Sequence, residues 1–137
     1  MNDEVFIISY PKAGRTWLRA LIGKYLSLKY NLPDKNLLET EKLTKKIKLP
    51  PVHFTHDGSE WVQDKPLRLK KNISYRHLPT DKLKYRNKKI ILLSRNIKDI
   101  VVSAYFQAHN RENVFNGTIS EFIRDERFGI KRIIRIL

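Results

Sequence analysis

The sequence predicts a three-layer α/β fold built on a parallel sheet. Two short apolar runs, residues 5–8 and 90–93, have the length and composition of buried inner strands. Each run precedes a stretch in which apolar residues recur with a helical period, at 16–28 and 97–105. Strands that alternate with helices in this way form parallel sheets, and ligands bind outside the carboxyl ends of such strands.

The first strand leads through a loop with one glycine into the first helix, and residues 10–18 of this stretch read Y-P-K-A-G-R-T-W-L. A helix N-terminus offers unpaired N–H groups and the positive end of the helix dipole. Lys12 adds a positive charge, and Gly14 lets the backbone turn tightly. Thr16 is placed either to cap the helix or to donate to an oxyanion. The stretch therefore predicts an anion-binding loop; the alternative is an ordinary strand-to-helix turn with a surface lysine.

This loop is not a Walker A motif. That motif reads G-x-x-x-x-G-K-[ST], with its lysine after the second glycine. Here Gly14 is the only glycine of the loop, and Lys12 precedes it.

The middle of the chain predicts one further strand. Residues 31–34 end the first helix, and 35–48 are interpreted as a loop or a short exposed helix. Residues 52–55 suit a short strand, and 72–75 suit another extended piece. His56 then follows a strand, so we expect it at the same sheet edge as Lys12.

The strand at 90–93 is followed by Ser94-Arg95-Asn96 and the second helix. Asn96 is a candidate N-cap. Arg95 stands at a strand end, where its guanidinium can hold a phosphate through two hydrogen bonds. Ser103 follows eight residues later, about two helical turns on, and can reach the same anion. The alternative is a strand and helix with a surface arginine.

The C-terminal part predicts two short helices. Residues 118–121 have the spacing of a capping box, and apolar residues at 130, 133, 134 and 137 share one helical face. The chain shows no repeats and no low-complexity linker, so we predict a single domain over residues 1–137.

Composition narrows the class of protein. The 137 residues are 41% hydrophobic and contain no cysteine, which predicts a folded chain without disulfides or thiolate metal sites. No basic leader and no run of membrane-spanning length is present, so we expect a cytoplasmic protein.

The 28 Lys and Arg against 14 Asp and Glu give a formal charge of +14. This charge suits a phosphate-rich ligand, an anionic acceptor, nucleic acid or an acidic membrane; the alternative is a solvated basic surface.

Two motifs in the expected order resemble those of the sulfotransferase family. Residues 10–18 resemble the family's 5′-phosphosulfate-binding loop, and R-N-I-K-D-I-V-V-S at 95–103 resembles its 3′-phosphate-binding motif. These enzymes transfer a sulfuryl group from PAPS (3′-phosphoadenosine-5′-phosphosulfate) to an acceptor and release PAP. The resemblance implies a P-loop nucleoside triphosphate hydrolase-like fold. It also implies a set of PAPS-binding residues: Lys12, Ala13, Gly14, Arg15, Thr16, Trp17, Arg95 and Ser103.

Three residues have specific roles in this resemblance. Lys12 is also catalytic, because it stabilises charge on the moving sulfuryl group and on the leaving phosphate. Trp17 matches the tryptophan that stacks on adenine; a core aromatic is the alternative. Thr55-His56 matches the T-H pair that carries the catalytic base, and an ordinary histidine pKa of about 6.5 suits that role. The alternative for His56 is a loop histidine without a role, with Asp57 as the nearest substitute base.

The chain departs from the family pattern at several positions. Ala13 and Arg15 replace the usual serine and threonine, Ile97 replaces a proline, and Phe54 stands where a lysine often precedes T-H. The family's C-terminal R-K-G-x-x-G-x-W motif has no match here. The resemblance covers only the N-terminal half of the family domain, so we expect a truncated form of the fold.

The predicted function is PAPS-dependent transfer of a sulfuryl group to a hydroxyl or amine of a small-molecule or glycan acceptor. No metal is expected, because cationic side chains can neutralise the charge and His53-x-x-His56-Asp57 lacks further ligands. We expect neither a specific nucleic-acid partner nor a membrane span. One alternative is a P-loop phosphoryl-transfer enzyme, against which the missing Walker lysine argues. The other is a non-enzymatic basic protein that binds nucleic acid or other anionic polymers.

Overall fold

The computed structural model describes residues 3–57 and 82–134. These residues form two compact units, which are treated separately. The first unit contains residues 3–9, 14–55 and 82–93, and the second contains 10–13, 56–57 and 94–134. The expected extended piece at 72–75 and the last part of the C-terminal helix face lie outside the described residues. The single-domain organisation stays a prediction.

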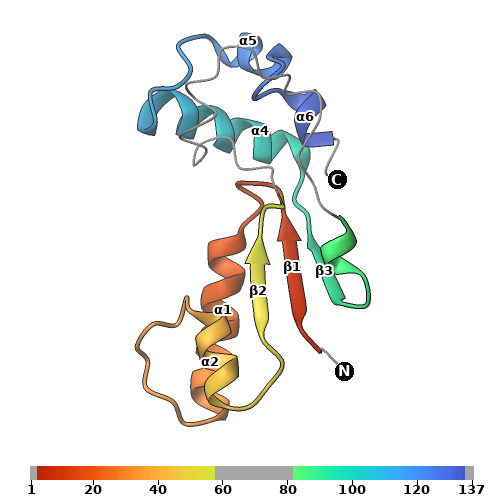
Figure 1. Ribbon diagram of the computed structural model, residues 1–137. Coiled ribbons are helices and arrows are strands. Elements are labelled where there is room, and N and C mark those ends of the chain that lie inside the picture. Colours follow the sequence, from red (N-terminus) through yellow and green to blue (C-terminus); the bar gives the residue numbers. More distant parts are fainter. Residues whose placement is uncertain (1–2, 58–81, 135–137) are drawn as a thin grey trace. The chain divides into compact units, whose positions relative to one another are not determined.

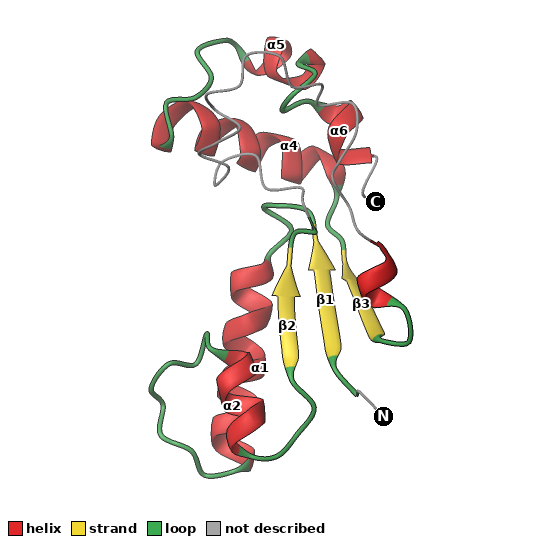
Figure 2. Cartoon of the chain, viewed as in Figure 1, coloured by secondary structure: helices red, strands yellow, loops and turns green. Residues whose placement is uncertain are grey.

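The first unit contains a three-stranded parallel sheet, which confirms the predicted α/β class (Figures 1 and 2). Its strands are β1 (Val5–Ser9), β2 (Val52–Thr55) and β3 (Lys89–Leu93), in the order β2-β1-β3. Ile8 pairs with Thr55 on one side and with Leu92 on the other. The three strands therefore end in register, and the loops that follow them all start from one edge of the sheet.

Helix α1 (Arg15–Lys29) confirms the first predicted helix, and it packs with α2 (Thr40–Lys46), which in turn packs on β2. Apolar residues form two adjacent lines along α1, and the line through Leu26 points inward, since that side chain is 5% exposed. The other line is exposed: Trp17 is 78%, Leu21 65% and Tyr25 57% accessible. Helix α2 lies where the sequence suggested a loop or a short exposed helix, and it buries Thr40, Leu43 and Thr44.

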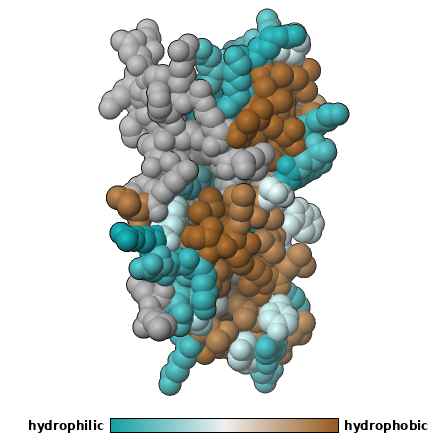
Figure 3. All heavy atoms as spheres, turned by 90° about the vertical axis from the view of Figure 1, so that its right-hand side faces the viewer, coloured by the Kyte–Doolittle hydropathy of each residue, from teal (hydrophilic) through white to brown (hydrophobic). Residues whose placement is uncertain are grey.

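Strand β3 begins one residue before the predicted 90–93, and it lacks the predicted burial. Ile90, Ile91 and Leu92 are 44–50% exposed, although they alternate between the two faces of the sheet. The strand lies at one edge of the sheet that the described residues form. Figure 3 shows the side of the first unit on which β3 lies, and apolar residues form much of the surface there. A 3₁₀ turn, Lys82–Tyr85, precedes the strand. The Tyr85 ring packs edge-on against Phe6 of β1.

The close approach of α1 to a neighbouring loop gives a stability prediction. A Cβ at Gly23 would overlap the backbone carbonyl of Leu37. Gly23→Ala gains about 1 kcal/mol of helix propensity but forces backbone apart, and such overpacking costs about 1–3 kcal/mol. We expect a net loss of unfolding free energy in a denaturant titration. Leu28→Ala, at a side chain that is 71% exposed, serves as the control and should change little. A stabilised Gly23→Ala variant would contradict this packing.

The second unit is helical and holds an aromatic core. Its elements are α4 (Ile97–Phe106), the π-helical turn η2 (Gln107–Arg111), α5 (Ile119–Arg124) and α6 (Ile130–Ile134). The Phe115, Phe122 and Phe128 rings contact one another with centroids 5.1–5.8 Å apart, and Tyr105 packs on the first two. Through Tyr105 and Phe122, this cluster packs α4 against α5.

The predicted caps in this unit are confirmed. The Asn96 side chain accepts a hydrogen bond from Lys98 N at 3.0 Å at the start of α4. Thr118 and Glu121 form the reciprocal capping box of α5. Both caps use local side chain–backbone bonds, which is why sequence spacing alone predicts them.

Candidate anion-binding site

The loop between β1 and α1 is tightly wound. Ala13 N donates to Tyr10 O at 3.3 Å, and two residues have positive φ: Lys12 at 74° and Gly14 at 97°. No atom of the described residues lies within 4 Å of a Cβ built on Gly14, so the positive φ of 97° is the reason that this position favours glycine. A lysine in the left-handed region costs about 1–3 kcal/mol, and such residues cluster at ligand-binding sites.

Lys12 is half-buried in the second unit, where it faces α4 and η2. Its Nζ donates to Gln107 Oε1 at 2.8 Å, and its carbonyl accepts from Arg95 Nη1 at 3.4 Å. The structure thus brings together Lys12 and Arg95, the two cations that the sequence motifs predicted. No ion pair joins Lys12 to a carboxylate of the described residues; Arg95 itself lies 3.4 Å from Asp99.

The pKa of Lys12 is lowered, first by burial and then by the positive charges of Arg111 and Arg95. Arg111 and Arg95 are therefore each close enough to Lys12 to repel its ammonium, and we call these three residues the Lys12 cluster. Like charges gathered without an anionic partner on Lys12 destabilise the protein, and a bound anion removes this cost. The cluster is suited to binding a ligand with phosphate or sulfate groups.

Sequence reasoning missed Gln107 and Arg111. They follow Ser103 at four and eight residues on the continuous path of α4 and η2. Residues at such spacing share a helix face, so extending the second motif by two turns would have found both. The π-helical turn between them had no sequence signal, although such turns are frequent at functional sites.

Ser103 lies on α4 and is partly buried. No hydrogen bond joins its hydroxyl to Lys12 or Arg95 in the part of the chain that the structure describes. Its predicted role therefore rests on its helix position beside Gln107 and not on a contact.

Of the remaining loop residues, Ala13 belongs to the second unit and residues 14–17 belong to the first. Gly14 is the N-cap of α1, and no side chain among residues 3–57 and 82–134 caps this helix, so the exposed Thr16 does not act as a cap. Ala13 is buried and Arg15 partly buried. Trp17 is 78% exposed, so the alternative that it is a core aromatic is wrong.

His56 follows the last residue of β2, as predicted, and is only 8% exposed. Asp57 comes next, equally buried and with φ of 49°. Because β1, β2 and β3 end in register, the chain segments that carry Lys12, His56 and Arg95 all leave the same edge of the sheet.

Neither a metal centre nor a membrane span is found in the described ranges 3–57 and 82–134. No group of three His, Cys, Asp or Glu side chains there could hold a metal ion. His53 instead stacks on Phe6 and lies 3.2 Å from Glu41. No helix in those ranges is both long and apolar enough to cross a bilayer.

Comparison with known proteins identifies the same family that the two sequence motifs resemble. The model of the sulfotransferase domain matches residues 2–129. Human Sulfotransferase 4A1 is 32% identical over 127 residues, which cover 89% of this chain and 42% of that protein. Bovine Sulfotransferase 1E1 is 36% identical over 112 residues, 76% of this chain and 35% of that protein. Mouse Sulfotransferase 1B1 is 33% identical over 129 residues, 88% of this chain and 40% of that protein.

The chain spans about two fifths of the length of these curated relatives. A search of the solved structures gave no significant match. Because the domain model covers nearly the whole sequence, this chain belongs to the sulfotransferase family.

Proposed function

We propose that this protein binds PAPS and transfers its sulfuryl group to a hydroxyl or amine of a small-molecule or glycan acceptor. One observation carries the proposal: Lys12 is half-buried among the cations Arg95 and Arg111 and has no carboxylate partner in the described chain. PAPS carries a phosphosulfate and a 3′-phosphate, and several fixed cations suit such a ligand.

The proposed reaction needs charge stabilisation more than covalent chemistry. The acceptor oxygen or nitrogen forms a bond to sulfur while the bond from sulfur to the phosphate oxygen breaks, and PAP leaves with that electron pair. Lys12 stabilises the negative charge that grows on the leaving phosphate. His56 takes the acceptor proton as general base.

The other roles follow from the family resemblance. Backbone N–H groups of Ala13, Gly14 and Arg15 and the Thr16 hydroxyl would contact the 5′-phosphosulfate, and the exposed Trp17 ring would stack on adenine. Arg95 and Ser103 would hold the 3′-phosphate. Arg111 adds a cation to the same unit, and Gln107 holds the Lys12 ammonium in place until the ligand competes for it.

The formal charge of +14 also favours a second candidate, a non-enzymatic protein that binds anionic polymers. Such binding would show a steep dependence on salt, and any preference for the more highly charged PAP over AMP would not depend on Arg95 in particular. The nucleotide titrations of the Arg95 variant described below therefore separate the two functions.

Arg95→Ala tests the proposed donor site. PAP differs from 5′-AMP by its 3′-phosphate, so a variant without the Arg95 guanidinium should lose most of the preference for PAP, which we expect to be about tenfold or more. Lys98→Ala removes an exposed cation three residues away and is the matched control. Calorimetric titration of each variant with both nucleotides gives the ratio of its PAP affinity to its AMP affinity. An unchanged ratio in Arg95→Ala would remove Arg95 from the 3′-phosphate site.

A further inference from the structure

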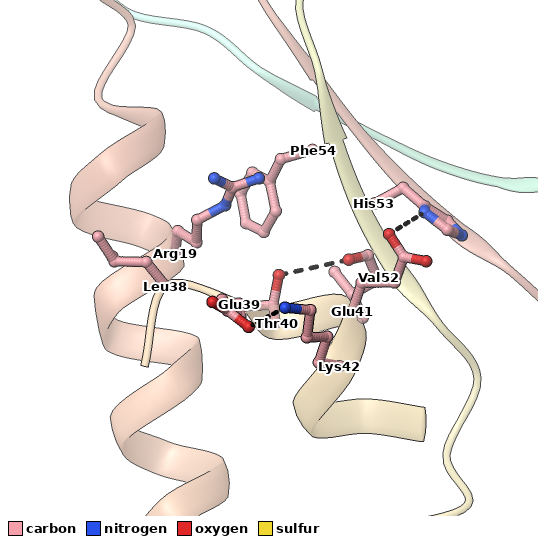
Figure 4. A pocket seen from close by; sticks show the side chains of 9 residues that line it. All are labelled: Arg19, Leu38, Glu39, Thr40, Glu41, Lys42, Val52, His53 and Phe54. Atoms are coloured by element: carbon pink, nitrogen blue, oxygen red, sulfur yellow. Dashed lines mark hydrogen bonds and ion pairs between the residues drawn. The ribbon is translucent and has the colours of Figure 1, made fainter. Parts of the chain in front are cut away.

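The first unit contains a cavity that is lined by none of the predicted PAPS-binding residues. This cavity of about 370 Å³ opens between α1, the start of α2 and β2 (Figure 4). This volume falls at the lower end of the range for small-molecule sites. The cavity is lined by Arg19 of α1, by residues 38–42 and by residues 52–54.

Arg19 supplies a cation to this cavity. Its guanidinium lies over the Phe54 ring, 4.9 Å from the centroid, as Figure 4 shows. Its Nε is buried without a hydrogen-bond partner, and no described residue forms an ion pair with it. Stacking occupies the face of the guanidinium and leaves its N–H edge for a planar oxyanion. Because Nε itself is closed to solvent, a ligand in the cavity would bind through the Nη groups of Arg19, for which no hydrogen bond to a described residue is found.

The two carboxylates of the wall are already neutralised. Glu39 is paired with Lys42 at 2.7 Å. Glu41 is paired with Lys45 at 2.7 Å and contacts His53 Nδ1 at 3.2 Å. The hydrogen bond from Lys45 is the main cause that lowers the pKa of Glu41, so this carboxylate stays ionised and paired near neutral pH. Arg19 is left as the uncompensated charge among these groups.

The rest of the wall is apolar or already bonded. Leu38, Val52 and Phe54 present hydrocarbon, and Thr40 donates its hydroxyl proton to Val52 O at 3.3 Å. We propose that this cavity binds a small organic carboxylate, with the carboxylate on the Arg19 guanidinium and an apolar or aromatic body against Leu38 and Phe54. None of the lining residues belongs to the proposed PAPS-binding set, so this proposal does not rest on the proposed function.

Benzoate and benzyl alcohol are the probes that test this site. They have similar size and shape but differ in charge, so we expect benzoate to bind about tenfold tighter or more. The measurement is a titration of the full chain, followed through backbone amide NMR shifts at constant ionic strength. The shifts should saturate and centre on residues that line the cavity.

Substitutions at Arg19 identify the anchoring group. Arg19→Met keeps the hydrocarbon stem and should weaken benzoate binding about tenfold or more, with little effect on benzyl alcohol. Arg19→Lys keeps the positive charge but lacks the planar guanidinium. Its benzoate affinity should lie between those of the unmodified chain and Arg19→Met. Lys24→Gln removes a positive charge from the same helix outside the cavity and is the matched control.

Three results would overturn the proposal. The first is equal affinity of the unmodified chain for the two probes, which needs no variant and is unaffected by folding defects. The second is unchanged benzoate affinity in folded Arg19→Met or Arg19→Lys. The third is a set of shifts centred on Lys12 and Arg95, which would place the benzoate in the proposed PAPS site and leave that function untouched.

Discussion

Replacing Lys12 by methionine is expected to weaken PAP binding at least tenfold and to slow sulfuryl transfer by about 10²–10³-fold, the usual effect of removing one donor to a developing oxyanion. The ammonium is half-buried beside Arg95 and Arg111, so an anion that binds there interacts strongly with it. Methionine keeps the side-chain stem and the same Cβ at φ 74°, so the backbone strain is unchanged. Calorimetry measures PAP affinity, and transfer of labelled sulfate from PAPS measures turnover.

Lys98→Gln is the matched control for this experiment. It removes an exposed cation from α4 in the same unit and should leave both quantities near those of the unmodified chain. If Lys12→Met retained full PAP affinity and turnover, the Lys12 cluster would have no part in the reaction.

Replacing His56 by glutamine is expected to reduce transfer by about 10²–10⁴-fold, the contribution of a general base, while PAP affinity stays the same. In the proposed mechanism His56 contacts the acceptor and not the nucleotide, so the two readouts separate. Glutamine keeps a polar side chain at a position that is only 8% exposed, which limits the loss of stability.

His53→Gln provides the comparison for His56. It changes a histidine of the first unit that contacts Glu41 and stacks on Phe6, and it should leave turnover intact. Normal turnover in His56→Gln would assign the proton transfer to another group, with the neighbouring Asp57 as the next residue to substitute.

Local signals predicted much of this fold. Strands β1, β2 and β3 were found from short β-branched runs, and the caps at Asn96 and Thr118 from side chains that bond their own backbone. Such features depend on residues within a few positions of one another. The parallel arrangement followed because helices alternate with these strands.

Burial was harder to predict, because it depends on partners far away in the sequence. Apolar side chains of β3 and one line of α1 are exposed, although their patterns resemble those of buried elements. Trp17 is the clearest case, since its sequence context suited an adenine platform and a core residue equally. Gln107 and Arg111 were missed because they belong to neither motif and meet Lys12 only in the folded second unit.

Titration of the unmodified chain with PAP and with 5′-AMP is the most direct test of the proposed donor site. The Lys12 cluster and Ser103 should give saturable binding of PAP, with a Kd about tenfold or more below that of AMP because of the 3′-phosphate. Equal affinities for the two nucleotides, or no saturable binding of PAP, would contradict the assignment of this cluster as a PAPS site.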